Sequence, residues 1–412
     1  MSRLRFGAFL APHHPIGEHP MLQFQRDIGL VEQLDKLGYD EFWCGEHHSS
    51  GWEMIASPEM FLAAAAQKTH RIKLATGVVS LPYHHPFHVA QRMVQLDYMS
   101  GGRAIFGSGP GALASDAHTL GVDPMLLRDR QDEAISVIRR LFAGERVTTK
   151  SDWFQMNDAA LQLLPLQEEM PFAVASQISP SGMTLAGKHG IGIISIGSLS
   201  DEGLNALPTQ WSFAEAAAKK HGQTVDRANW RVLLSWHIAE TREKAREQAR
   251  DGLLRHHNEY ITATLQRPGA RPFKDGDTAV DAMAFSQGAA ATIGTPDDLV
   301  ERIKSVIDIS GGFGTVVGFV HDWANPENTA RSWDMVARYV IPEINGYLAG
   351  LRKSRAFVAD NREYFDRARQ AVMAKINENE LAAAALAVTR SPMLSASASN
   401  VPDFTAMRKA GE

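Results

Sequence analysis

Glu46-His47-His48, Thr76-Gly77-Val78-Val79-Ser80-Leu81-Pro82 and Phe106-Gly107-Ser108-Gly109-Pro110-Gly111 decide the fold of this chain. Each stretch lies at the downstream end of a short apolar run. Runs that are apolar throughout are typical of parallel strands buried on both faces. In a closed barrel of alternating strands and helices, the downstream strand ends meet on one face, where catalytic residues gather. The three stretches are therefore expected to lie together in a functional site.

Eight such apolar runs alternate with helical patterns, which predicts an α/β fold, a (β/α)8 TIM barrel rather than an open sheet. The helical segments carry apolar residues three and four positions apart, as in the segment that ends before Gly38. We expect strands at Arg5–Leu10, Glu41–Gly45, Ile72–Ser80, Arg103–Gly107, Pro171–Ala175, Gly192–Ile196, Val232–Ala239 and Thr315–Val320.

Two segments depart from this repeat. Residues 252–291 contain several prolines and glycines and are too long for an ordinary connection. We interpret them as an insertion that lies over the catalytic face of a barrel spanning residues 1–349. Residues 350–412 are charged, then Ala-rich, then rich in Ser and Asn, which predicts a C-terminal extension that begins as helix and ends disordered.

Composition restricts the class of protein. Of 412 residues, 44% are hydrophobic and 22% are charged, which is ordinary for a globular chain with a sizeable core. The net charge of -5 and the absence of a dense Lys/Arg block argue against nucleic-acid or anionic-membrane binding. The single cysteine, Cys44, fits a reducing compartment. No apolar run approaches the roughly 20 residues that span a bilayer, so we expect a cytoplasmic protein.

His47 and His48 are candidates for proton transfer. A histidine titrates near neutral pH, and the end of a strand holds it rigidly. The alternative is that both histidines only fix the loop by hydrogen bonds. The Gly77-Val78 step lies inside an apolar strand, where glycine normally weakens pairing. It indicates either a close approach of the backbone to a flat ligand or a bulge without one.

The stretch Ser176-Gln177-Ile178-Ser179-Pro180-Ser181-Gly182 joins the fifth predicted strand to the next helix. Serine hydroxyls, an amide and the N–H groups of a helix start can bind a phosphate without a cation. An ordinary helix cap would need one serine, and this loop has three. The candidate phosphate ligands are Ser176, Gln177, Ser179, Ser181 and Gly182.

The order and content of these stretches resemble the bacterial-luciferase-like flavin-dependent monooxygenases over roughly residues 5–345. The resemblance implies that His47 is catalytic with His48 as its supporting partner. It also implies a cis peptide at Gly77–Val78 beneath the flavin ring, room for the flavin at Gly109, and an acid near the flavin at Asp116. For Asp116, a surface loop acid is the alternative. Luciferase has a cysteine and a phosphate-binding arginine at the positions of Gly109 and Pro110, so phosphate binding here is expected to fall to the loop of residues 176–182.

The resemblance further implies a two-component enzyme. A separate flavin reductase would supply reduced FMN, which reacts with O2 to give a peroxyflavin. One oxygen atom then enters a small apolar substrate such as a terpene, ketone or aldehyde, and the other leaves as water. The insertion would exclude water from the site. Family members pair through helices near the second and third strands, so we expect a homodimer, and the face of Met60, Ala64 and Met93 is apolar enough for its interface. Core packing within the barrel explains the same three residues equally well.

Three alternatives remain open at this stage. The same fold supports oxidoreductases that use the deazaflavin F420, and a non-catalytic flavin-binding protein would share the pattern. A metal-dependent hydrolase is the third, because the doublets His13-His14, His47-His48 and His84-His85 follow successive strands. Adjacent strand residues point to opposite faces, so only one histidine of each doublet can reach a common centre. We therefore predict no metal.

Overall fold

The computed structural model describes residues 3–11, 13–267, 269–286, 289 and 291–389. The chain divides into two compact units, residues 1–346 and 347–412. The first unit contains the candidate site and is described first.

Eight parallel strands of the first unit form a closed ring. Each strand pairs with the next along the chain, and the last pairs with the first in the register Arg5–Thr315 to Leu10–Val320. The ring confirms the predicted barrel. Its strands are β1 (Arg5–Leu10), β2 (Glu41–Cys44), β3 (Lys73–Thr76), β5 (Ala104–Gly109), β8 (Phe172–Ser176), β9 (Gly192–Ser195), β10 (Trp230–Ile238) and β12 (Thr315–Val320).

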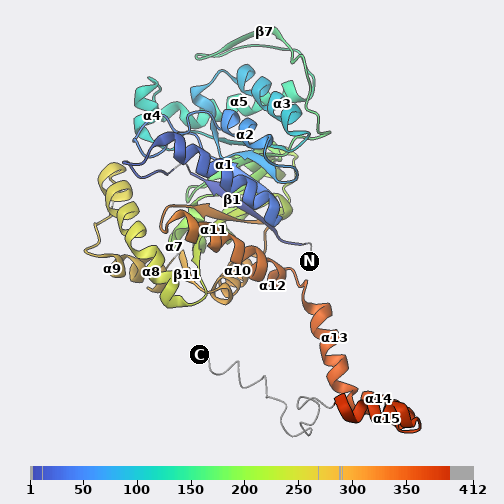
Figure 1. The fold of residues 1–412 in the computed structure, drawn as a ribbon. Helices are drawn as coiled ribbons and strands as arrows, with labels where there is room; N and C mark the ends of the chain where they lie inside the picture. The colour runs from blue at the N-terminus through green and yellow to red at the C-terminus, as the bar shows by residue number, and fades with distance from the viewer. Residues whose placement is uncertain (1–2, 12, 268, 287–288, 290, 390–412) are drawn as a thin grey trace. The chain divides into compact units, whose positions relative to one another are not determined.

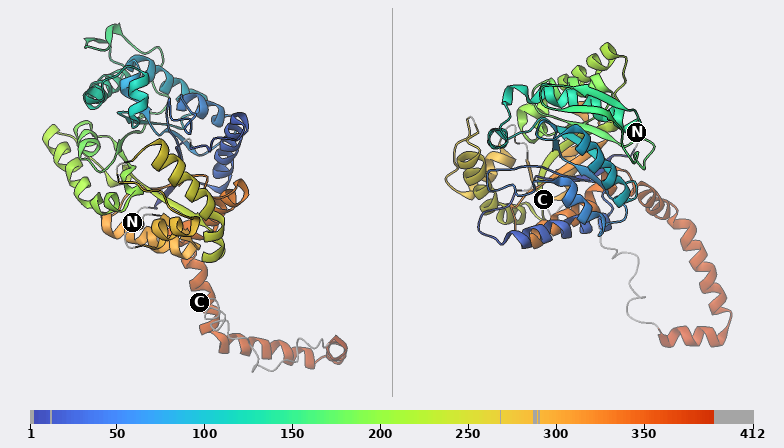
Figure 2. Two further views of the ribbon diagram at one scale, coloured as in Figure 1. Left: turned by 90° about the vertical axis from the view of Figure 1, so that its left-hand side faces the viewer. Right: turned by 90° about the horizontal axis from the view of Figure 1, so that it is seen from above.

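Helices lie around the outside of the strands (Figures 1 and 2). Several begin at a proline in the first turn and end at a left-handed glycine, as at Gly38 and Gly311. The helices of this unit are α1 (Pro20–Leu37), α2 (Pro58–Ala66), α3 (Pro86–Ser100), α4 (Ala114–Thr119), α5 (Leu127–Phe142), α6 (Ser181–His189), α7 (Asp201–His221), α8 (Arg242–Arg255), α9 (Gly276–Val280), α10 (Pro296–Ser310), α11 (Pro326–Met335) and α12 (Ile341–Ile344).

A buried ion pair lies at the start of the strands. Glu41 is the first residue of β2, and Arg231 is the second residue of β10. The two side chains form a bidentate contact, with Nε–Oε2 at 2.7 Å and Nη2–Oε1 at 2.9 Å. Trp43 Nε1 donates to the same carboxylate at 3.0 Å. Burial would raise the pKa of Glu41, but Arg231 and the other partners hold it below its usual value. The pair therefore stays ionised and joins two strands that are not neighbours.

Two features of the strands were missed from the sequence. The predicted strand Ile72–Ser80 is divided into β3 and β4 (Val79–Ser80) by a cis peptide. A hairpin of β6 (Val147–Lys150) and β7 (Gln155–Ala159) was not expected, because these strands are short and mostly exposed and lack an apolar run.

The inserted segment is mostly helical. After α8 the chain continues as a π-helix, His256–Thr264, followed by α9, a second π-helix (Asp281–Phe285) and strand β11 (Ala291–Gly294). Strand β11 pairs in parallel with β10 and was also missed. The segment buries an apolar cluster, which includes Ala245, Ala249, Leu253, Ala279, Val280 and Ile293.

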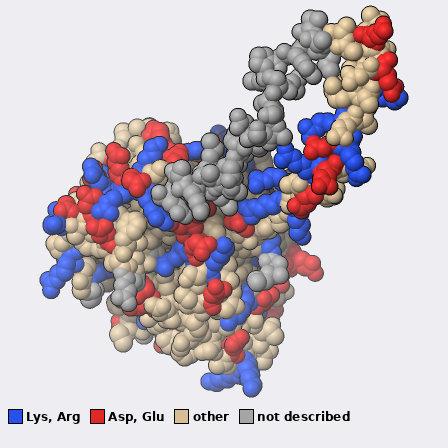
Figure 3. Space-filling view, turned by 90° about the horizontal axis from the view of Figure 1, so that it is seen from below, with Lys and Arg blue, Asp and Glu red and all other residues tan. Residues whose placement is uncertain are grey.

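The second unit contains α13 (Ala349–Asp360), α14 (Arg362–Asn377) and α15 (Glu380–Thr389). The disorder predicted for the end of the extension concerns residues 390–412, which lie outside the described residues. Across the described residues, no helix is long and apolar enough to cross a bilayer. Positive and negative side chains are interspersed on the face shown in Figure 3.

Candidate functional site

His47 lies between two carboxylates. It follows β2, and its Nδ1 is 3.0 Å from Asp116 Oδ2 while its Nε2 is 3.4 Å from Glu53 Oε2. Asp116 is only 1% exposed, so it is not a surface acid. Burial alone would lower the pKa of His47, but the hydrogen bond with Asp116 and the charge of Glu53 raise it overall. The arrangement favours an imidazolium that can donate a proton.

The backbone of the loop brings Glu53 back onto His47. Ser50 and Gly51 both have positive φ, 78° and 77°, and so reverse the chain within the loop. Glu53 then lies opposite His13, whose Nε2 is 3.1 Å from Glu53 Oε1. Burial would raise the pKa of Glu53, but the contacts with His13 and His47 lower it. Glu53 therefore remains a carboxylate that links two histidines from different loops.

His48 points away from His47 and contacts Glu46. Glu46 Oε1 is 2.8 Å from His48 Nε2 and 2.7 Å from His84 Nε2, and Oε2 accepts from the N–H of Ser80 at 3.0 Å. Burial raises the pKa of Glu46, yet these hydrogen bonds lower it to about 2. His48 still supports the site through its backbone N–H, which donates to Asp116 at 3.1 Å.

The atoms of Glu46, His48 and His84 are close enough together to be considered as metal ligands. Each ring Nε2 already makes a hydrogen bond with the carboxylate. The positively charged guanidinium of Arg92 also lies 3.5 Å from His84 Nδ1 and would repel a metal cation bound there. The cluster is explained as a hydrogen-bond network that joins the loop after β2 to His84, which lies between β4 and α3.

The Gly77–Val78 peptide is cis, as the resemblance implied. A Cβ at Gly77 would lie 2.9 Å from Phe9 Cε2 and 3.0 Å from Trp43 Cβ. At Gly109 it would lie 2.5 Å from Val78 Cγ2. The Gly77–Val78 bend packs closely against the barrel, and this packing requires a glycine at both positions. The sequence pattern had suggested a contact with a ligand as the reason.

Tyr83 supplies a buried polar atom beside this bend. Its hydroxyl has no hydrogen-bond partner among the described residues, and it lies 2.3 Å from the position of a Cβ on Gly111. Burial, together with the charges of Asp116 and Glu46, raises the pKa of Tyr83 to about 12. A buried phenol without a partner fits a site whose ligand supplies the hydrogen bond.

The predicted phosphate loop follows β8 and leads into α6. Pro180 occupies the N-cap position, and no side chain accepts from the first turn of the helix. Gln177 and Ser179 are exposed, whereas Ser176 is buried and its Oγ donates to the carbonyl of Gln177 at 3.3 Å. Ser179 Oγ and Ser181 Oγ are 3.4 Å apart. Exposed hydroxyls beside uncapped N–H groups fit a phosphate.

Gly182 sets how closely α6 approaches the sheet. A Cβ at this position would lie 2.5 Å from the carbonyl oxygen of Ala175 and 2.8 Å from Ser176 Cα. The helix start can meet the end of β8 only because residue 182 has no side chain. β8 pairs with β5, which carries Gly109, so the loop belongs to the same face of the barrel as the bend.

Residues of the insertion reach this face. The ring of Tyr260, in the π-helix, lies 4.5 Å from that of His13 and 5.5 Å from that of Trp52. Burial and the neighbouring Glu53 carboxylate raise the pKa of the Tyr260 phenol. Sequence reasoning missed Glu53, His13 and Tyr260 as partners of one another, because their contacts join two separate loops and a helix and leave no pattern of spacing.

Of the two explanations for the apolar face of Met60, Ala64 and Met93, core packing holds for Met93, which is fully buried. Met60 is 75% exposed and Ala64 is exposed as well. Met93 lies on the inner side of α3, where its apolar character serves packing within the barrel.

Comparisons with known proteins agree with this geometry. The family model described as "Luciferase-like monooxygenase" matches residues 4–311. The chain is 46% identical over 365 residues to a 4-hydroxyprotoasukamycin monooxygenase of Streptomyces nodosus subsp. asukaensis, covering 87% of this chain and 97% of that protein. It is 47% identical over 347 residues to a limonene 1,2-monooxygenase of Rhodococcus erythropolis, covering 84% and 88% respectively.

A solved structure shares the fold. The oxygenating constituent of 3,6-diketocamphane monooxygenase from Pseudomonas putida, a type II Baeyer-Villiger monooxygenase in complex with FMN, aligns with a TM-score of 0.70. The two sequences are 24% identical, and the alignment covers 82% of this chain and 98% of the solved structure. With the family match over most of the barrel and these sequence identities, the chain belongs to the luciferase-like monooxygenase family of enzymes.

Proposed function

We propose that this protein is the oxygenase of a two-component, FMN-dependent monooxygenase that inserts one oxygen atom of O2 into a small apolar organic molecule. His47 carries the proposal: it lies at the downstream end of the strands and is held by carboxylates on both ring nitrogens. General acid catalysis by a positioned histidine contributes typically about 10²- to 10⁴-fold to a rate. Its role here is to hold and donate a proton beside the reacting atoms.

The residues on this face fit FMN. The uncapped start of α6 with Ser179 and Ser181 would hold the phosphate, and the bend at Gly77–Val78 would lie against the ring system. The unpartnered hydroxyl of Tyr83 would supply a hydrogen bond. Reduced FMN, when bound, supplies the two electrons that oxygen activation requires. Tyr260 and the π-helix would keep water from the site.

The proposed substrate class follows from the relatives and the site. Two of the relatives are named for limonene and diketocamphane, which are small and largely apolar molecules. No nicotinamide-binding pattern was found in the sequence, which supports delivery of reduced flavin by a separate reductase. We also propose a homodimer, with Met60 as an exposed apolar contact.

The test is incubation of the purified protein with chemically reduced FMN, ¹⁸O2 and a panel of terpenes, cyclic ketones and aldehydes, with products read by mass spectrometry. We expect one ¹⁸O atom in a product. Oxidation of a substrate only in the presence of F420, without incorporation of ¹⁸O, would instead identify an F420-dependent oxidoreductase.

Flavin binding is tested separately. The double variant Ser179→Ala/Ser181→Ala is expected to weaken FMN binding at least tenfold, because two phosphate ligands are removed, while the melting temperature stays unchanged. Fluorescence titration measures the affinity. Equal affinity in wild type and variant would place the phosphate elsewhere.

A further inference from the structure

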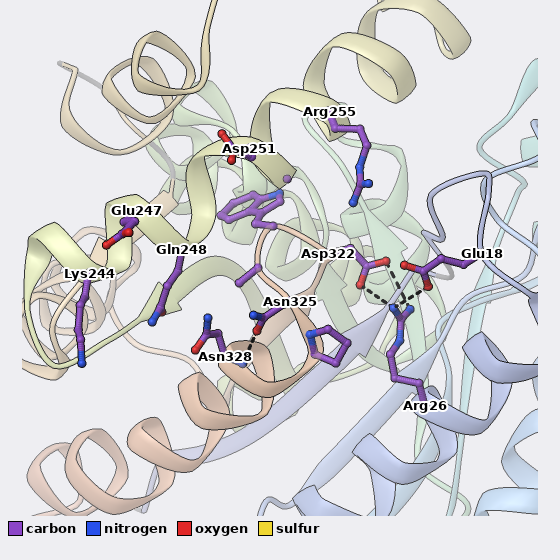
Figure 4. Close-up of a pocket in the computed structure, with 14 residues that line it drawn as sticks. Glu18, Arg26, Lys244, Glu247, Gln248, Asp251, Arg255, Asp322, Asn325 and Asn328 are labelled. Carbon is purple, nitrogen blue, oxygen red and sulfur yellow. Dashed lines mark hydrogen bonds and ion pairs between the residues drawn. The ribbon is translucent and has the colours of Figure 1, made fainter.

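A charged cavity of about 610 Å³ lies beyond the end of β12, between α1, α8 and α11 (Figure 4). The carboxylates of Glu18 and Asp322 point toward the guanidinium of Arg26 (Figure 4). Arg26 Nη1 is 3.3 Å from Asp322 Oδ1 and 3.9 Å from Glu18 Oε2. Since its walls carry mostly charged and amide groups, the cavity suits water rather than an apolar substrate.

A second cavity, of about 170 Å³, shares part of its wall with the first. Arg26 and Asp322 border both cavities, so their ion pair lies at the boundary between them. The smaller cavity is also bordered by His13 and Asp27. A water molecule occupies about 30 Å³ in the liquid, so a cavity of this size has room for several.

His13 connects the smaller cavity to the candidate site. Its Nδ1 is buried and has no partner in the described part of the chain, while its Nε2 contacts Glu53 at 3.1 Å. The other oxygen of Glu53 lies 3.4 Å from His47 Nε2. Glu53 Oε2 makes no hydrogen bond with the described residues, so this last contact is an ion pair. The three side chains thus lie in contact from the cavity to the proposed proton donor.

His321 borders the same cavity but is already engaged. Its Nε2 is 3.0 Å from the carbonyl oxygen of Trp236, and its Nδ1 accepts from the N–H of Trp323 at 3.4 Å. Burial lowers the pKa of His321 to about 3, so this ring stays neutral. His13 is therefore the histidine of this cavity with a nitrogen free to exchange a proton.

Asp322 lies at the boundary between the cavities, where its pKa is raised above its ordinary value. Burial raises the pKa of its carboxyl group, and the charges of Asp27 and Glu18 act in the same direction. Arg26 and His14 oppose this rise without cancelling it. Arg26 also contacts Asp27, so a single guanidinium is shared by the buried Asp27 and the partly exposed Asp322.

We propose that the two cavities form a proton-entry path that runs from solvent past Asp322 to His13, Glu53 and His47. The path rests on the proposed function, because oxygenation by the anionic form of reduced FMN takes up one proton when water is released, and His47 must regain the proton it gives. A proton that reaches His13 Nδ1 through cavity water allows Nε2 to release its own proton to Glu53 Oε1. The carboxyl group then turns and delivers that proton to His47 Nε2, and His47 is restored. His13 is left with its proton on Nδ1 and must return to the Nε2–H tautomer by exchange with cavity water before the next cycle.

There is a physical reason for protons to reach His47 by a path separate from the mouth of the barrel. The mouth of the barrel must exclude water while an apolar substrate reacts, so the same opening is a poor route for protons. His13 borders the smaller cavity and contacts Glu53, whereas neither Glu53 nor His47 lines either of the two cavities.

The test compares Asp322→Asn with Asp251→Asn, a matched change on the wall of the same larger cavity but away from its boundary with the smaller one. The full-length, flavin-free protein is labelled with ¹⁵N-histidine, and exchange of the His47 ring N–H with D2O is followed by NMR. His47→Gln assigns the signal. We expect Asp322→Asn to slow the exchange at least tenfold and Asp251→Asn to leave it unchanged.

His13→Gln provides a second variant at the inner end of the path, with the same expected slowing. Unchanged exchange in Asp322→Asn or His13→Gln, or equal slowing in the control, would overturn the path. If either variant fails to fold by circular dichroism, the other decides. Turnover with reduced FMN and O2 is measured in parallel: absent oxygenation with Asp322-dependent exchange would refute the function but retain the path, and the reverse result would refute the path alone.

Discussion

Asp116→Asn tests the central contact of the site. The substitution removes a buried negative charge 3.0 Å from His47 Nδ1 but preserves the size of the side chain. A hydrogen bond between charged groups contributes about 1.5–3 kcal/mol, and 1.36 kcal/mol corresponds to one pKa unit. The pKa of His47 should therefore fall by about 1–2 units, because the charges that remain to favour the imidazolium are those of Glu53, at 3.4 Å, and Glu46.

The change should also appear in stability. The folded-state pKa of His47 is raised, so its contribution is fully present below the unfolded value of 6.5 and is lost as the pH rises through the folded value. The pKa of Asp116 is lowered, so its contribution is present above the unfolded value of 3.8. The difference in unfolding free energy between wild type and variant should be largest at about pH 5–6 and should shrink at higher pH.

The assays are an NMR titration of ¹⁵N-histidine-labelled protein and urea denaturation at several pH values. Asp251→Asn serves as the control, since Asp251 is highly exposed and pairs with its neighbour Arg250. A His47 pKa that stays the same or rises in Asp116→Asn would refute the reasoning, because the carboxylate would then not be what favours the charged ring.

Four further predictions concern other parts of the barrel. His47→Ala should retain FMN binding in a fluorescence titration but lower product formation by about 10²-fold or more; equal turnover would make this histidine structural. Gly182→Ala should weaken FMN binding at least tenfold, since its Cβ would meet the end of β8 and displace the helix start; unchanged affinity would contradict the phosphate assignment. Arg231→Ala should lower the unfolding free energy by about 3 kcal/mol in urea titrations, because the buried Glu41 carboxylate would keep Trp43 and the more distant Arg5, at 4.0 Å, but lose its bidentate partner; a loss below about 1 kcal/mol would show that these partners or water suffice for that carboxylate. Gly29→Ala, at an open and exposed position of α1, should raise the unfolding free energy by about 0.5–1 kcal/mol, and a decrease would show an unseen constraint on the helix.

The ring of eight strands could be predicted because each strand is buried on both faces and therefore apolar throughout. The strands that escaped prediction differ in this respect. The strands of the hairpin at residues 147–159 are mostly exposed. Strand β11 lies at the end of the insertion, which the sequence analysis interpreted only as a segment over the catalytic face. Local apolar pattern carries no signal for strands of this kind.

The candidate site was predictable to the extent that its residues follow strands. His47 stands directly after β2, so the topology alone brings it to the catalytic face. Asp116 was expected near the flavin only from the family resemblance, and its contact with His47 depends on how α4 packs. Glu53 could not be predicted, because its place depends on a reversal at Ser50-Gly51 and on His13 from another loop.

The contact between Glu41 and Arg231 has a consequence for redesign. The contact lies at the end of the barrel opposite His47 and Gly182. Residues that stabilise the barrel and residues of the candidate site therefore lie in separate regions of the molecule. Loops on the side of the candidate site can be exchanged to admit larger or differently shaped substrates, while the ion pair at the opposite end stabilises the barrel. A library of variants confined to those loops should therefore retain a high proportion of folded proteins.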